Sequence, residues 1–97
     1  MSYIVVIRFE GVSEADYWSV NDKLGIKRDG SGDWPKGILA HTAGATSDGW
    51  VVAERWSSKA AQEAFMGARL GAAMAAAGIP APVQVIDFET ANEQFPA

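Results

Sequence analysis

Apolar residues dominate the segment Tyr3 to Phe9 (YIVVIRF), which is also rich in β-branched side chains. A continuous apolar run of this length is typical of a strand that is buried on both faces. Arg8 is the exception, and the alternation of side chains along a strand places it on the same face as Ile4 and Val6. A charged group on such a face needs an ionic partner or access to water.

A helix is predicted directly after this strand. Ser13 is suited to cap its first free amides. Tyr17, Val20 and Leu24 then follow at helical spacing and form one apolar face. Gly25 is the residue at which we expect this helix to end.

A second, alanine-rich helix is predicted from about Lys59 to Ala77, with Ser57 or Ser58 as its cap. Gly78 suits the position after its last turn, and Pro80 cannot continue a helix. We therefore expect one unbroken helix between these limits.

The remaining apolar segments predict three more strands. Gly37 to Gly44 and Trp50 to Trp56 flank the turn-forming sequence Ala45–Gly49, so that they form a hairpin. Val83 to Glu89 gives the last strand. A polar connection, residues 26–36, precedes the hairpin and has a length typical of functional or mobile loops.

The predicted order is therefore β-α-β-β-α-β, and it defines an α+β, ferredoxin-like fold. Two right-handed crossovers around a central hairpin give a four-stranded antiparallel sheet in the order 4-1-3-2, with both helices on one face. The first strand is then central, as its apolar character requires.

The strands carry apolar side chains on both of their faces, not on one alone. In the first strand Val5 and Ile7 face one way while Ile4 and Val6 face the other. Because both helices cover the first face, another molecule must cover the second. We expect a C₂ homodimer in which the two sheets face each other.

Composition adds limits to this picture. Ninety-seven residues with 48% hydrophobic content predict one domain, residues 1–97. The chain has no cysteine and one histidine, so we expect no disulfide, no metal site and no cofactor. The net charge of −4 and scattered basic residues argue against nucleic-acid binding. The chain shows neither a signal-peptide pattern nor an apolar segment of about 20 residues, so we expect a cytoplasmic protein without a membrane partner.

The segment Gly49–Ser58 (GWVVAERWSS), together with the order of elements, resembles the dimeric α+β barrel superfamily, and within it the small antibiotic-biosynthesis-monooxygenase-like proteins. This resemblance implies a barrel-like dimer with a pocket, and members include cofactor-independent oxygenases and haem-degrading enzymes. The haem-degrading members use an Asn on the first strand and a Trp and a His on the second helix. This chain has no such Asn or His, and Phe65 stands about where that Trp would fall, so that active site is not carried over.

His41 is the only side chain whose unperturbed pKa is close to neutrality. It lies on a predicted strand with Leu39 and Ala43 on its own face. Three interpretations stay open: a buried structural histidine, an acid–base or ligand-binding group in a pocket, or a metal ligand. We name His41 as the candidate catalytic residue.

Glu54 is a carboxylate between Val52 and Trp56 on one strand face, and burial requires that it be paired or reach water in a cavity. Arg8, on the neighbouring strand, is the expected partner. The hairpin register decides whether His41 shares the face of Glu54 or the opposite face. We favour the register that brings the two together.

Four tryptophans are many for a chain of this length. Packing in the core and at the dimer interface explains most of them, and a flat aromatic ligand stacked among them is the alternative. Trp34 lies in the polar loop and either covers the core edge or closes a pocket. The expected ligand pocket comprises Arg8, Trp34, Trp50, Glu54 and Trp56.

Two functions follow from these residues and the resemblance. The first is a cofactor-independent, monooxygenase-like enzyme that acts on a small aromatic or polyketide-like molecule, with His41 handling the proton. The second is a non-catalytic dimer that binds a hydrophobic ligand or serves as a structural module.

Overall fold

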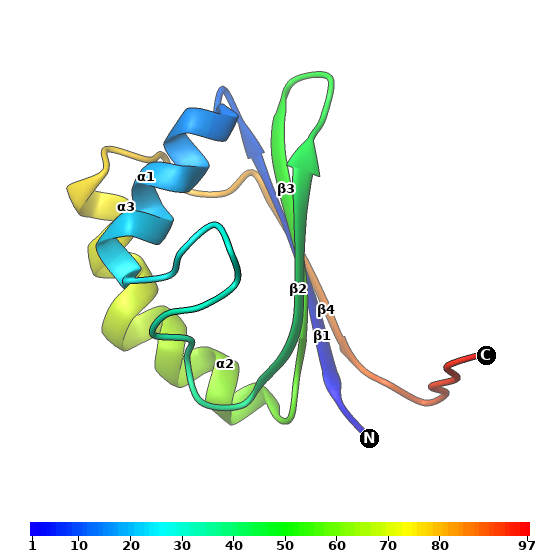
Figure 1. Ribbon diagram of the computed structural model, residues 1–97. Helices are drawn as coiled ribbons and strands as arrows, with labels where there is room; N and C mark the ends of the chain where they lie inside the picture. Colours follow the sequence, from blue (N-terminus) through cyan, green and yellow to red (C-terminus); the bar gives the residue numbers. More distant parts are fainter.

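The computed structural model describes all 97 residues, and Figure 1 shows a single sheet with its helices packed on one side. The elements follow in the order β1 (Tyr3–Glu10), α1 (Glu14–Leu24), β2 (Ile38–Ala45), β3 (Gly49–Trp56), α2 (Lys59–Phe65), a π-helical segment (Met66–Leu70), α3 (Gly71–Ala76) and β4 (Gln84–Glu89). None of the helices combines the length and apolar character needed to cross a bilayer.

The four strands pair antiparallel in the order β2-β3-β1-β4, which confirms the predicted ferredoxin-like α+β topology. In the hairpin, His41 of β2 stands opposite Glu54 of β3. Glu54 is in turn opposite Val5 of β1. The register therefore brings His41 and Glu54 together, as favoured from the sequence. It shifts between Ile38 and Ala40 near the start of β2.

The ends of helix α1 follow from local sequence. The amide of Asp16 donates to the Ser13 hydroxyl at 3.1 Å, and the Ser13 amide donates to the Asp16 carboxylate at 2.9 Å. This capping box satisfies amides that the first turn leaves free. At the other end Gly25 has φ 77°, a left-handed conformation that a glycine adopts without steric cost.

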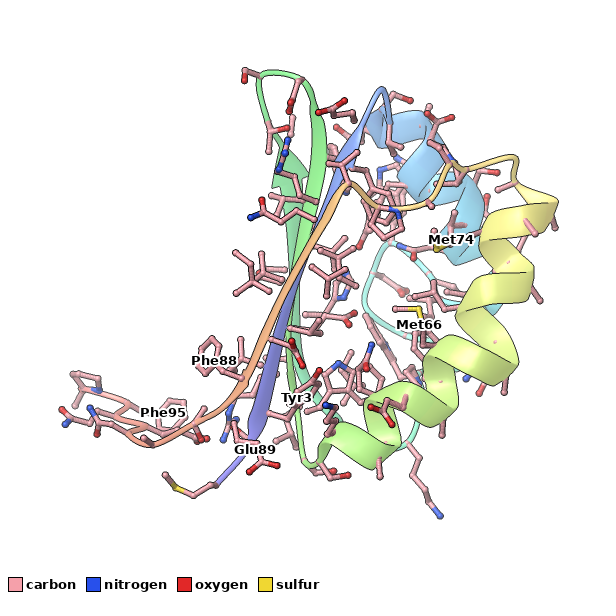
Figure 2. All side chains as sticks on the ribbon, turned by 180° about the vertical axis from the view of Figure 1, so that it is seen from behind. Tyr3, Met66, Met74, Phe88, Glu89 and Phe95 are labelled. Carbon is pink, nitrogen blue, oxygen red and sulfur yellow. The ribbon has the colours of Figure 1, made fainter.

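The second helical region differs from the expected unbroken α-helix. It begins where predicted, with the Ser58 hydroxyl accepting from the Ala61 amide. Residues Met66–Leu70 are then π-helical, and the Gly71 amide donates to the Met66 carbonyl, five residues earlier. A π segment widens the turn and changes the direction of the side chains around it, which composition alone does not predict. Figure 2 shows Met66 and Met74 on the side of this helix that faces the sheet.

The core lies between the sheet and the helices. The inward residues of β1 are buried, with Val5 only 1% exposed, and Trp56 of β3 is fully buried. The core comprises Tyr3, Val5, Ile7, Phe9, Val12, Val20, Leu24, Ile26, Trp50, Trp56, Phe65 and Ala73. The apolar periodicity of the strands and helices thus forms one continuous core.

The opposite face of the sheet has no helix on it (Figure 1). Ile4 and Val6 are only partly buried there, and every residue of β4 is exposed. Ile86 and Phe88 are each 50% exposed. Figure 2 shows Phe88 and Phe95 on the side of the sheet away from the helices. A single chain therefore buries β1 on one face, and the second face is the one for which a covering molecule was predicted.

A polar cluster fixes the segment that follows β4. Glu93 accepts hydrogen bonds from the hydroxyls of Ser2 and Thr90 and from the guanidinium of Arg55, the last at 3.0 Å. The Ser2 amide also donates to Glu93, at 2.8 Å. These bonds, above all those from the two hydroxyls, hold the pKa of Glu93 at about 2, well below its ordinary value.

Candidate functional site

A cavity of about 70 Å³ lies between the inner face of the sheet and the helices. Fifteen of its twenty lining residues are hydrophobic. Its walls come from β1, β2, β3, α1, the helix after β3 and the loop between α1 and β2. The polar residues and the residues with a polar ring among them are Asp16, Tyr17, Asn21, Trp34, His41, Trp50 and Glu54. A mostly apolar concave site with a few convergent polar groups is typical of a small-molecule site.

His41 and Glu54 meet at this cavity because they are paired across the β2–β3 hairpin. Nδ1 of His41 lies 2.7 Å from Oε2 of Glu54, and the two side chains are 17% and 8% exposed. The indole of Trp56 donates to the other oxygen, Oε1, at 3.1 Å. The carboxylate is thus held by two donors, which is how a buried carboxylate avoids the cost of desolvation.

Tyr17 of α1 completes a chain of hydrogen bonds. Its hydroxyl lies 2.5 Å from Nε2 of His41. A carboxylate can only accept, so Nδ1 carries the proton in the bond to Glu54. In the neutral ring Nε2 is then an acceptor, and the Tyr17 hydroxyl donates to it. The direction of every bond in the chain Tyr17–His41–Glu54 is fixed by this chemistry.

The pKa of Tyr17 is raised above its ordinary value, chiefly because the phenol is removed from water. A hydrogen bond with Asn21 acts in the opposite direction, and the negative charge of Glu54 adds to the increase. Tyr17 therefore keeps its proton at neutral pH unless His41 takes it.

The arrangement can move a proton in either direction. An acidic group in the cavity can pass its proton to the Tyr17 oxygen while Tyr17 passes its own to His41, and Glu54 stabilises the imidazolium that results. This is the organisation of a base oriented by a carboxylate, with a phenol as the group that meets the ligand. When the protons move in the opposite direction, from His41 through Tyr17 to the ligand, Tyr17 acts as an acid.

Aromatic rings surround this chain. The rings of Tyr17 and Trp50 have centroids 5.2 Å apart, and those of Trp34 and His41 are 5.5 Å apart. The Nε1–H group of Trp50 is buried and has no hydrogen-bond acceptor. That of Trp34 donates to the Gly30 carbonyl at 2.8 Å, within its own loop.

Arg69, which lies in the π-helical segment, holds the loop that carries Trp34. Its guanidinium donates to the Asp33 carbonyl at 2.7 Å, to the Asp33 carboxylate at 3.1 Å and to the Leu24 carbonyl at 2.9 Å. Trp34 thus closes one side of the cavity from a loop that is fixed at both of its sides. Trp34 was expected either to cover the core edge or to close a pocket. Its position is consistent with both interpretations, since it packs against the core and also lines the cavity.

Arg8 does not lie in the cavity, where it was expected as the partner of Glu54. Its side chain lies on the open face of the sheet, where it donates to Asp48 at 2.9 Å and to Gln84 at 3.3 Å. The expected Arg8–Glu54 pair is therefore wrong. In the register Arg8 pairs with Val51 and Val5 pairs with Glu54, so Arg8 and Glu54 project from opposite faces.

The other expected pocket residues lie on the inner face. Trp34, Trp50 and Glu54 line the cavity beside His41. Trp56 is fully buried behind it and contacts the site through Glu54. Tyr17 was assigned from the sequence only to the apolar face of a helix. The spacing of Tyr17 in the helix does not predict the contact of its hydroxyl with His41, because this contact depends on how α1 lies across β2.

No group of three or more His, Asp or Glu side chains is placed to hold a metal ion.

Comparison with known proteins gives a likeness in structure alone. No protein-family model matches the chain, and no curated protein matches it in sequence. The fold is similar to that in the crystal structure of a candidate antibiotic biosynthesis monooxygenase from Chloroflexus aurantiacus J-10-fl. The two share 12% sequence identity over 98% of each chain, with a TM-score of 0.62. The chain therefore has the α+β fold of antibiotic-biosynthesis-monooxygenase-like proteins.

Proposed function

We propose that the protein is an enzyme that removes a proton from a small aromatic molecule and lets the deprotonated ring react with molecular oxygen, without metal or organic cofactor. The observation that carries this proposal is the chain Tyr17–His41–Glu54, which ends at an apolar cavity. The likeness to a candidate antibiotic biosynthesis monooxygenase supports the same class of reaction.

The reaction assigns a role to each member of the chain. The Tyr17 oxygen accepts the proton of a ring hydroxyl as its own proton moves to Nε2 of His41, and Glu54 stabilises the charged imidazole. The resulting phenolate is electron-rich and reduces oxygen. For a phenol converted to a quinone, one oxygen atom enters the ring, and the second leaves as water with the two hydrogens lost. The apolar walls favour the neutral substrate and exclude competing water.

Oxygen uptake by the purified protein tests this function. Phloroglucinol, resorcinol and their acetyl derivatives serve as one-ring substrates in buffer treated with a chelator. Mass spectrometry then follows transfer of one labelled atom from oxygen-18 gas into a quinone product. We expect product from at least one compound, above the rate of autoxidation.

His41→Gln is the matched variant, because a glutamine can keep hydrogen bonds to both neighbours but cannot relay a proton. A general base contributes about 10²- to 10⁴-fold to a rate, and we expect a loss in that range. Thr42→Ala, one residue further along β2 and exposed, is the control that keeps full activity. The proposal fails if no compound takes up the label, or if His41→Gln is as active as the parent.

The second candidate function is a module that binds a hydrophobic ligand without turnover. The apolar lining of the cavity favours it equally. It would be supported by a His41→Ala variant that folds and binds para-ethylphenol as tightly as the parent, with no oxidation of any compound by either protein.

We further propose that the protein is a homodimer formed through the open face of the sheet. The support is apolar area: Ile4, Val6, Ile86 and Phe88 form an uncovered surface, and Phe95 extends on the same side (Figure 2). Exposed apolar surfaces of this kind mark interfaces, and a second copy offers the same surface.

Native mass spectrometry tests the dimer, with twice the chain mass expected. Phe88→Glu should shift the protein to monomer, whereas Ala60→Glu, which adds the same charge at an exposed site on α2, should leave the dimer intact. A monomeric parent, or a dimer that tolerates Phe88→Glu, would contradict the interface.

A further inference from the structure

One polar group in the wall of the cavity is left without a partner. Nε1–H of Trp50 is buried, and no protein atom accepts its hydrogen bond. The other cavity tryptophan, Trp34, donates to a backbone carbonyl, and Trp56 donates to Glu54. Buried donors are almost always satisfied, so an unpartnered donor on a residue that lines a cavity points to an acceptor from outside the protein.

The charge of the cavity restricts that acceptor. Two carboxylates, Asp16 and Glu54, line the wall, and no Lys or Arg does. An anionic oxygen brought into this apolar and acidic site would lose its hydration and gain no counter-ion. The acceptor is therefore a neutral oxygen, such as that of a ketone, an aldehyde or a quinone.

The size of the cavity restricts the ligand further. Its volume of about 70 Å³ is well below the ~300–1,000 Å³ of pockets that hold drug-sized molecules. It is also below the roughly 150 Å³ of an apolar cavity that holds benzene. A one-ring ligand already exceeds this volume, so its binding requires the cavity walls to move apart, and a fused polycycle would require a much larger movement.

We infer that the cavity binds a neutral, one-ring phenol that carries a carbonyl group, with its hydroxyl at Tyr17 and its carbonyl oxygen accepting from Nε1–H of Trp50. This inference rests on the proposed function for the role of Tyr17. It goes further in naming the substrate class and in making Trp50 a residue that selects it. The bond also orients the ring, because it fixes one end while the proton leaves the other.

Three probes differ only at the group that meets Trp50. Para-hydroxyacetophenone carries the carbonyl, para-ethylphenol has the same shape without it, and para-hydroxybenzoate is anionic. We expect the ketone to bind about tenfold more tightly than the ethyl compound, the scale of satisfying one buried donor. The benzoate should bind most weakly. Isothermal titration calorimetry gives the three dissociation constants.

Nuclear magnetic resonance reads the same bond without any turnover. The chain has four indole N–H signals, and Trp50→Phe identifies that of Trp50 by its loss. The ketone should move this signal downfield, with Trp18, which donates to Glu14 and does not line the cavity, as the internal control. In Trp50→Phe the ketone and the ethyl compound should bind equally. If this variant does not fold, the response of the Trp50 signal in the parent protein to the ketone still tests the inference.

The outcomes separate the two proposals. If the ketone moves the Trp50 signal but no compound is oxidised, the substrate class stands and the oxygenase function fails. If compounds are oxidised while the ketone and the ethyl compound bind alike and the Trp50 signal stays in place, the inference is overturned and the function stands. Failure of all three probes to bind also overturns the inference.

Discussion

Two polar clusters lie on the same sheet and differ in how completely they are satisfied. The cluster around Glu93 joins Ser2, Thr90 and Arg55 at one end of the sheet, and each Glu93 oxygen accepts from a donor of the protein. The cluster around Glu54 also has a carboxylate at its centre, but this carboxylate has only two donors. It continues through His41 to Tyr17, and both of these residues line a cavity.

The difference teaches how a structural ion cluster is distinguished from a reactive one. All partners of Glu93 come from its own chain, so this cluster has no position for a ligand and its low pKa reports stabilisation of the fold. The Glu54 cluster contains an imidazole and a phenol, groups that can pass a proton, and all three of its members line the cavity. Hydrogen-bonded carboxylates occur in both settings, and access to a cavity decides between them.

The largest expected difference between the two clusters is in the effect of a substitution on turnover, and it comes from removing the hydroxyl of Tyr17. Tyr17→Phe should lower the rate of labelled quinone formation by about 10²- to 10⁴-fold, because the group that takes the substrate proton is gone and Nε2 of His41 lies one hydroxyl further away. Glu93→Gln should leave the rate within twofold. A Tyr17→Phe protein with the parent's rate would place the reactive group elsewhere.

The next effect is that of the carboxylate behind the histidine. Glu54→Gln should reduce turnover about tenfold or more, since an amide stabilises an imidazolium less than a carboxylate does. It should also lower the free energy of unfolding by about 1–3 kcal/mol, the range for disturbing a buried hydrogen-bonded group. Urea denaturation measures the stability. Unchanged turnover with lowered stability would make Glu54 purely structural.

Acid should affect the Glu93 cluster in a defined direction. The pKa of Glu93 is lowered in the folded protein to about 2, from an ordinary value of 4.5. The stabilisation is therefore fully present above about pH 4.5 and is lost as the pH falls toward 2. The midpoint of thermal unfolding should fall across this window, and Glu93→Gln should make the decrease shallower. An equally steep decrease in the variant would assign acid sensitivity to other carboxylates.

The smallest effect concerns Arg8, which the sequence placed in the pocket. Its side chain contacts Asp48 and Gln84 on the open face, and the side chains of Arg8 and Asp48 are 35% and 48% exposed. Exposed ion pairs contribute about 0–1 kcal/mol, so Arg8→Ala should change stability by no more than that and leave turnover unchanged. A large loss of turnover would return Arg8 to the site.

The sequence predicted the fold because its information is local and periodic. Capping at Ser13, the turn before Gly49 and the alternation in β1 each define an element, and the order of elements then leaves few topologies. It also limited His41 to two possible faces, because the residue lies on a hairpin with Glu54, and the favoured register is the one that the structure has. The π-helical segment was not predicted, because no residue pattern required it.

The rest of the site depends on contacts between elements that are distant in the chain. Tyr17 reaches His41 only because of how α1 packs across β2, and no spacing within α1 reports that angle. Arg8 was assigned the wrong partner because strand adjacency was considered without strand face. Residue pairing across a sheet has to include the two-residue alternation before a charge partner is named.

The protonation state of the His41 ring tests the central claim most directly. His41 is the only histidine, so its two ring nitrogens can be observed by nitrogen-15 resonance without assignment. At pH 8 we expect a proton on Nδ1, shifted strongly downfield by Glu54, and a bare Nε2 that accepts from Tyr17. A proton on Nε2 instead, or a ring that exchanges freely with water, would contradict the relay.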